Sequence, residues 1–152
     1  MEDEHKAPLA TRAGQPPAWP ILLIEDSATA AATIEHTLRA MRLLNPVVLA
    51  TSLADAVPLL EHGLRPALVL LDYELPDGNG VDLLRTHGDR EPLLSTPVIM
   101  LSAHEGADEI DDAHRLGVTA YLVKPVAYDA VQDVVRRLPL PWFLGAPEQA
   151  VP

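Results

Sequence analysis

VLLDYELPDGNG, residues 69–80, begins as an apolar run and ends in a polar loop that contains two glycines. A short apolar run that is bounded by turn residues is typical of a buried strand. Asp72 stands where the apolar run stops, and Gly78 and Gly80 allow the loop behind it to turn tightly before the next helix. The stretch therefore predicts a buried strand that ends in a carboxylate.

Apolar runs of this character recur along the chain and alternate with longer amphipathic segments. The runs are ILLI (21–24), PVVLA (46–50), ALVLL (67–71), PVIML (97–101) and TAYLV (119–123). Helical spacing follows them, with Ala31, Ile34, Leu38 and Met41 after the first run and Val126, Ala130, Val134 and Leu138 after the last. Strands that are apolar at nearly every position are expected when helices cover both faces of a sheet. The pattern predicts an α/β fold with a doubly wound, five-stranded parallel sheet of the flavodoxin-like class.

The chain has the length of one ordinary domain with short ends. Residues 1–19 carry charges and prolines without a periodic apolar pattern, so we expect a flexible N-terminal lead. Residues 20–138 contain all five apolar runs and form the predicted domain. Residues 139–152 form a tail, in which prolines stop the last helix.

Composition excludes several classes of function. The formal charge of −11 opposes sequence-independent binding to nucleic acid or to an anionic membrane surface. The chain has no cysteine, which removes disulfides and thiolate chemistry and suits a reducing compartment. It also shows neither an export signal nor an apolar stretch of about 18 residues, so we expect no membrane contact and a cytoplasmic location.

Polar side chains follow four of the five predicted strands. The first strand ends in Glu25 and Asp26, the third in Asp72, the fourth in Ser102 and the fifth in Lys124. In an open parallel sheet these ends converge on the crevice where ligands bind. Clustered carboxylates repel one another unless a cation neutralises them, and Mg²⁺ prefers carboxylates, waters and a phosphate oxygen. The sequence therefore predicts a Mg²⁺ site for phosphoryl chemistry, with Asp72 as the candidate nucleophile and with Ser102 and Lys124 on phosphoryl oxygens.

These motifs resemble the receiver domains of bacterial two-component response regulators over about residues 20–138. The matching features are the acidic pair after the first strand, the DYELPDGNG loop, the LSA motif that contains Ser102, and Tyr121 three residues before Lys124-Pro125. The intervals of 30 residues from Asp72 to Ser102 and 22 from Ser102 to Lys124 are also typical of that family.

The resemblance implies a role for each residue of the site. Asp72 would accept a phosphoryl group from a histidine kinase or a histidine phosphotransfer protein. Asp26, Asp72 and the backbone carbonyl of Glu74 would bind Mg²⁺, and Glu25 would hold the ion through water. Lys124 would correspond to the family's lysine, followed by a cis proline at position 125.

The resemblance also implies a switch and a hydrolysis path. Ser102 would be the switch hydroxyl, and Tyr121 the aromatic residue that moves inward when that hydroxyl closes on the phosphoryl group. Glu74 and His104 occupy positions that flank the path of the hydrolytic water, which would tune dephosphorylation. The alternative is that both side chains simply point to solvent.

Three hypotheses for function follow. The first is a single-domain response regulator that acts on a downstream effector protein and is no enzyme beyond self-phosphorylation from small donors and autodephosphorylation. The second is a haloacid-dehalogenase-like phosphohydrolase with Asp72 as nucleophile, although that family needs a second aspartate where this chain has Glu74. The third is a flavodoxin-like cofactor binder, but the EDSATAA segment is a poor phosphate loop.

Two further segments carry predictions. The tail PLPWFLGAPE contains Trp142 and Phe143, which would bury a large area in a homodimer or partner contact. It weakly resembles the tails of receivers associated with bacterial phytochromes, and the alternative is that it folds back or stays mobile. Asp108, Glu109, Asp111 and Asp112 fall early in the fourth predicted helix, where we expect a solvated face.

Overall fold

The computed structural model describes residues 19–138, and the predictions for the rest of the lead and for the tail, including Trp142 and Phe143, lie outside these residues. Its elements are β1 (Ile21–Ile24), α1 (Ala28–Ala40), β2 (Val47–Ala50), α2 (Leu53–Glu61), β3 (Leu68–Asp72), β4 (Glu74–Leu75), β5 (Gly78–Asn79), α3 (Gly80–His87), the 3₁₀ turn η2 (Leu93–Ser95), β6 (Val98–Ser102), α4 (Ala107–Arg115), β7 (Ala120–Val123) and α5 (Tyr128–Arg136). The five predicted strands are all present.

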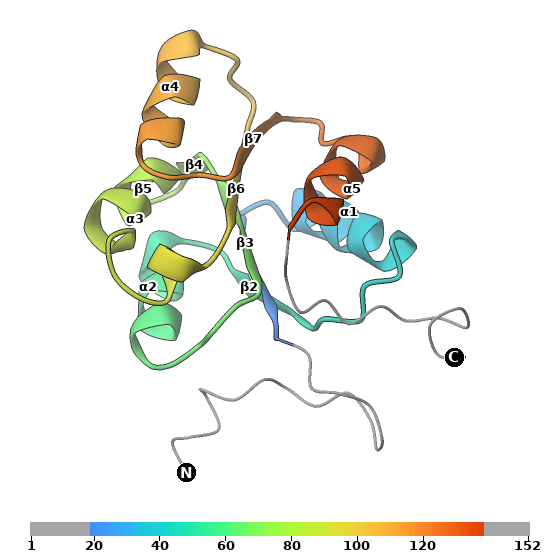
Figure 1. The fold of residues 1–152 in the computed structure, drawn as a ribbon, viewed down its shortest axis with the longest axis horizontal. Coiled ribbons are helices and arrows are strands. Elements are labelled where there is room, and N and C mark those ends of the chain that lie inside the picture. The colour runs from blue at the N-terminus through green and yellow to red at the C-terminus, as the bar shows by residue number, and fades with distance from the viewer. Residues whose placement is uncertain (1–18, 139–152) are drawn as a thin grey trace.

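The main sheet has the strand order β2-β1-β3-β6-β7, and all neighbouring strands in it are parallel. Helices α1 and α5 cover one face, and α2, α3 and α4 cover the other (Figure 1). The predicted doubly wound α/β fold is therefore confirmed. None of the helices within residues 19–138 is long and apolar enough to cross a membrane.

Burial along the strands follows their place in the sheet. Every residue of the three central strands β1, β3 and β6 is buried, as expected for strands that helices cover on both faces. The edge strands β2 and β7 are mostly half-buried, and Leu49 of β2 is 48% exposed. Two apolar clusters, one on each face, form the core.

Three details differ from the sequence-based expectation. β3 and β6 each continue one residue further than predicted, so that Asp72 and Ser102 belong to the strands. The most buried residues of α5 are Val131 and Val135, while the predicted Val126, Val134 and Leu138 are only partly buried against the same core cluster. The acidic start of α4 is largely exposed, but Asp112 accepts a hydrogen bond from Arg85 of α3 at 2.6 Å and is not purely solvated.

The polar loop after β3 is a small hairpin that sequence patterning did not predict, because its strands have only two residues each. β4 and β5 pair antiparallel, with Glu74 opposite Asn79 and Leu75 opposite Gly78. Gly78 has φ +150°, a backbone conformation that favours glycine. The hairpin therefore begins two residues after Asp72 and leads directly into α3.

Gly80 closes the base of this hairpin against the end of β3. Its N–H donates to the carbonyl oxygen of Tyr73 at 2.7 Å. A Cβ atom at position 80 would lie 2.4 Å from the carbonyl oxygen of Asp72, closer than real atoms approach. Glycine is required here by the close approach of two backbone segments, rather than by an unusual φ.

We expect Gly80→Ala to lower the free energy of unfolding by about 1–3 kcal/mol, because the rigid backbone at Asp72 must shift. Gly106→Ala is the matched control: a Cβ there would meet only the carboxylate end of the half-buried Glu109 side chain, which can rotate away, and we expect a change within about 0.5 kcal/mol. Urea unfolding of the three proteins measures both. Equal midpoints for wild type and Gly80→Ala would contradict the role of this contact.

Candidate functional site

From β1, the chain order runs to β2 on one side of the sheet and to β3 on the other, so the strand order reverses at β1. The predicted crevice lies at the carboxyl ends of these three strands. A hollow at this edge is lined by Glu25, Asp26, Ser27, Asp72, Glu74, Leu75, Pro76, Ala103 and Lys124. The fold thus brings together the predicted acidic residues and the predicted lysine. Ser102 is fully buried behind Ala103 and does not line this hollow.

Lys124 bridges the two buried carboxylates of the hollow. Its Nζ donates to Oε1 of Glu25 at 2.9 Å and to Oδ2 of Asp72 at 3.1 Å. Burial opposes the charged ammonium, but these two hydrogen bonds outweigh it and hold the pKa of Lys124 above its ordinary value. The Lys124–Pro125 peptide bond is cis, as predicted.

Asp72 is a buried carboxylate whose surroundings favour its protonated form. Burial, followed by the neighbouring Glu25 carboxylate, raises its pKa from 3.8 to about 6, although the Lys124 ammonium opposes the shift. Its Oδ1 accepts a hydrogen bond from the backbone N–H of Glu74 at 3.2 Å. Without a further cation, the site therefore holds more negative charge than Lys124 alone offsets.

Three carboxylates could hold such a cation. One oxygen from each of Glu25, Asp26 and Asp72 lies within 4.8 Å of the others. Glu25 is buried and also accepts from the N–H of Ser27, whereas Asp26 is exposed. A set of hard oxygen donors that is partly open to solvent fits Mg²⁺, which keeps several of its waters.

The two predicted switch residues both bind the backbone of His104. The Oγ of Ser102 accepts from the His104 N–H at 2.9 Å, and the Tyr121 hydroxyl donates to the His104 carbonyl at 3.1 Å. Tyr121 is half-buried against the core. The loop after β6 thus connects the serine and the tyrosine through one residue.

The exposed side chains of Glu74 and His104 contact each other. His104 Nε2 and Glu74 Oε2 form a hydrogen bond, and this bond raises the pKa of His104. The His104 ring also meets the Tyr73 ring edge-on at 6.0 Å. Sequence reasoning placed both residues near the site but did not predict their contact, since they are 30 residues apart.

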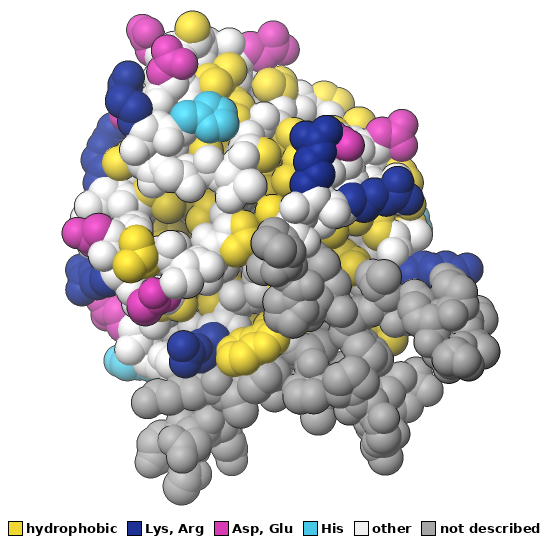
Figure 2. Space-filling view, in the orientation of Figure 1, with side chains coloured by type: hydrophobic (Ala, Val, Ile, Leu, Met, Phe, Trp, Pro, Cys, Tyr) yellow, Lys and Arg dark blue, Asp and Glu magenta, His cyan; other side chains and the backbone are white. Residues whose placement is uncertain are grey.

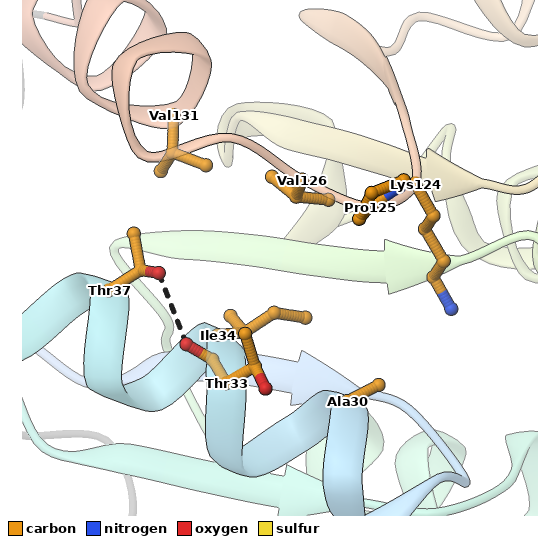
Figure 3. A pocket seen from close by; sticks show the side chains of 8 residues that line it. All are labelled: Ala30, Thr33, Ile34, Thr37, Lys124, Pro125, Val126 and Val131. Atoms are coloured by element: carbon orange, nitrogen blue, oxygen red, sulfur yellow. Dashed lines mark hydrogen bonds between the residues drawn. The ribbon is translucent and has the colours of Figure 1, made fainter.

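A second hollow of about 390 Å³ adjoins the site on the α1 side (Figure 3). It lies between α1 and the connection from β7 to α5, and Ala30, Thr33, Ile34, Thr37, Pro125, Val126 and Val131 line it together with the stem of Lys124. The hydroxyls of Thr33 and Thr37 donate to carbonyls of their own helix. The hollow is therefore apolar, and it shares Lys124 with the acidic site.

Acidic side chains gather over α4 on the face shown in Figure 2. Along the chain, Glu105 in the β6–α4 loop and Asp108 and Asp111 in α4 are exposed.

Comparison with known proteins gives one consistent result. The family model for the response regulator receiver domain matches residues 21–136. The chain is 32% identical over 117 residues to the transcriptional regulatory protein DpiA of Escherichia coli, of which it spans half the length. It is 32% identical over 122 residues to the chemotaxis protein CheY of Pseudomonas aeruginosa, covering 78% of this chain and 94% of CheY. The bacteriophytochrome response regulator AtBRR superposes with a TM-score of 0.73 at 31% identity, covering 86% of this chain and 99% of AtBRR.

The raised pKa of Asp72 predicts a pH-dependent stability cost. Because its pKa is higher in the folded state than the ordinary 3.8, its contribution to stability falls as the pH rises from about 4 to about 6. With chelator present, we expect the free energy of unfolding of Asp72→Asn to exceed that of wild type by about 1–3 kcal/mol near pH 7.5 and to equal it near pH 4. Urea unfolding measures this, with the exposed Asp129→Asn as control. A variant that is no more stable at the higher pH would contradict the pKa shift.

Proposed function

The chain belongs to the family of response regulator receiver domains, and from this premise we propose that Asp72 accepts a phosphoryl group from a histidine kinase or a histidine phosphotransfer protein. The observation that carries the proposal is the position of Asp72, which shares Lys124 with Glu25 at the carboxyl edge of the sheet. Residues 20–138 form the receiver domain in this proposal.

The chemistry assigned to each residue follows from its contacts. An oxygen of Asp72 attacks the phosphorus atom, the bond from phosphorus to the donor nitrogen breaks, and the nitrogen keeps the electron pair. Lys124 is already hydrogen-bonded to Asp72, so it can follow the transferred group as a point charge on a phosphoryl oxygen. Mg²⁺, held by Asp26, Asp72, the Glu74 carbonyl and, through water, Glu25, would neutralise the carboxylates and the incoming phosphate.

The proposed response begins at Ser102. When its hydroxyl turns to donate to a phosphoryl oxygen, its bond with the His104 N–H is lost, and the loop that also binds the Tyr121 hydroxyl is released. A phosphoryl group that interacts only with the conformation in which Ser102 has turned shifts the equilibrium toward it. Tyr121 then moves inward, and an effector protein reads the changed face of α4, β7 and α5.

Glu74 and His104 are proposed to tune dephosphorylation. Their side chains are hydrogen-bonded to each other, and Glu74 lines the hollow that contains Asp72, so we expect a hydrolytic water to pass beside this pair. Separation of the two side chains would open the path of the hydrolytic water to Asp72. When the two side chains stay hydrogen-bonded, the path would be closed and the phosphoryl group would have a longer lifetime.

Receivers are signalling domains, and the family match gives no support to the haloacid-dehalogenase-like alternative. The chain spans 94% of the length of CheY, and we propose that this receiver domain acts through its contact with an effector protein. Self-phosphorylation from small donors and autodephosphorylation are the only catalytic steps that we assign to it. Its location is proposed to be cytoplasmic, with no contact to nucleic acid or membrane.

A protein donor needs a surface beside the acceptor, and we propose that it uses the apolar hollow between α1 and the β7–α5 connection. This hollow is continuous with the site through Lys124. An apolar side chain of the donor would enter it while the phosphohistidine faces Asp72.

The homodimer contact through Trp142 and Phe143 stays a proposal about residues outside 19–138. Light scattering of the intact chain and of a chain that ends at Leu138 would test this contact. If both chains are monomers at high concentration, the proposed homodimer is refuted.

With Mg²⁺ and acetyl phosphate, we expect acid-labile phosphate on Asp72 of the wild-type protein, because this carboxylate binds Lys124 and lies beside the acidic pair. Asp72→Asn should carry no label, Asp129→Asn should be labelled normally, and chelator should abolish the labelling of wild type and Asp129→Asn. Mass spectrometry of the intact proteins measures this. A label that persists on Asp72→Asn, or continuous turnover of a phosphate monoester, would refute the proposed function.

For the donor surface, we expect Ala30→Leu to slow transfer from a histidine kinase that phosphorylates the wild-type chain by about tenfold, equivalent to about 1.4 kcal/mol, since the larger side chain fills the hollow. Labelling by acetyl phosphate should be unchanged. Ala32→Leu makes the same substitution at an exposed position of α1 that does not line the hollow and should leave both rates unchanged. If the kinase phosphorylates the two variants at equal rates, the donor binds to another surface of the receiver.

A further inference from the structure

The hairpin β4–β5, which carries Glu74, is attached to the body of the protein at both of its ends. At its base, the Glu74 N–H binds Asp72, and the Gly80 N–H binds Tyr73. At its tip, the side chain of Asp77 reaches a helix that lies more than twenty residues earlier in the chain.

Asp77 caps the N-terminus of α2 with both carboxylate oxygens. Oδ1 accepts from the N–H of Leu53 and Oδ2 from the N–H of Ala54, each at 2.9 Å. These bonds, led by that from Leu53, hold the pKa of Asp77 below its ordinary value. A carboxylate at a helix N-terminus is also favoured by the helix dipole.

The rest of the helix start is satisfied locally. The Asp55 N–H donates to the Ser52 hydroxyl at 3.0 Å, and the Ala56 N–H donates to the Ser52 carbonyl at 3.1 Å. The first four N–H groups of α2 are thus shared equally between Ser52 and Asp77. Ser52 is a conventional cap, whereas Asp77 connects the helix to another part of the molecule.

Close packing reinforces the same connection. A Cβ atom at Gly78 would lie 3.0 Å from Cδ1 of Leu53, so the hairpin tip rests directly on the first residue of α2. Leu75, between Glu74 and the tip, is buried in the core on this face of the sheet. The position of the Glu74 backbone therefore depends on where α2 begins.

We propose that Asp77 is a positioning residue for the metal centre: by fixing the hairpin tip to α2, it places the Glu74 carbonyl beside Asp26 and Asp72. The inference rests on the proposed Mg²⁺ site. Because coupling between two sites is reciprocal, cation binding should in turn stabilise the start of α2.

The test compares Asp77→Ala with Ser52→Ala, which removes the other cap of the same helix terminus without touching the hairpin. Mn²⁺ serves as the probe, and its binding is followed by electron paramagnetic resonance. We expect Asp77→Ala to bind Mn²⁺ about tenfold more weakly than wild type, at the low end of the losses seen for groups that orient metal ligands. Ser52→Ala should bind like wild type, although urea unfolding should show that both variants are less stable.

The change in amide hydrogen exchange on adding Mg²⁺ supplies a second readout. A general loss of stability would alter the exchange with and without Mg²⁺ and would not remove this change. Mg²⁺ should slow the exchange of α2 amides from Ala56 onward in wild type and in Ser52→Ala, but not in Asp77→Ala. Asp77→Asn, which keeps one acceptor oxygen, should be intermediate in both measurements.

The outcomes separate the two proposals. If wild type binds Mn²⁺ and Asp77→Ala binds it equally well, or if Ser52→Ala loses as much affinity as Asp77→Ala, the positioning role is wrong and the metal site stands. If the wild-type protein does not bind Mn²⁺, the proposed metal site itself fails.

Discussion

The balance of charge around Lys124 is the constraint on which the site depends. Two buried carboxylates, Glu25 and Asp72, come from adjacent strands, and one ammonium from a more distant strand binds both. Burial without partners would cost several kcal/mol for each charge, so the three side chains must stay together. One positive charge does not neutralise two carboxylates, and burial together with the neighbouring Glu25 raises the pKa of Asp72. A site that is short of positive charge is suited to attract a cation.

Backbone packing fixes the geometry in which this balance acts. Gly80 touches the carbonyl of Asp72, and the hairpin between them allows no room for a side chain at that point. Asp72 is therefore held by β3 on one side and by the start of α3 on the other. This arrangement explains how a carboxylate can be almost fully buried and still line a hollow that is open to solvent.

Sequence patterning predicted the strands, their layers and the residues at the edge of the sheet, because apolar runs and strand-end carboxylates are local signals. It could not predict contacts between loops that lie far apart in the sequence. The bonds of Asp77 to α2 and of His104 to Glu74 join residues separated by 24 and 30 positions. Gly78 and Gly80 did predict a tight turn, but only the folded chain shows which helix the neighbouring Asp77 carboxylate binds. The bond from Arg85 to Asp112 in the otherwise exposed acidic segment of α4 was not predicted for the same reason, since Arg85 lies on another helix.

The two loops beside Asp72 differ in how firmly they are held. The β3–α3 hairpin is bound to α2 through Asp77 and enters α3 through a capping box formed by Asn79 and Asp82. By contrast, α4 begins at Gly106 without a side-chain cap, and the β6–α4 loop meets the hairpin through the exposed Glu74–His104 pair and one ring edge. Segments with few buried contacts open at the lowest free energy. Asp72 therefore lies between a firmly held loop and a weakly held one, and Ser102 and Tyr121 both bind the backbone of the second through His104. If Asp72 gains a phosphoryl group as proposed, the second loop is the one whose position can change at the lower cost.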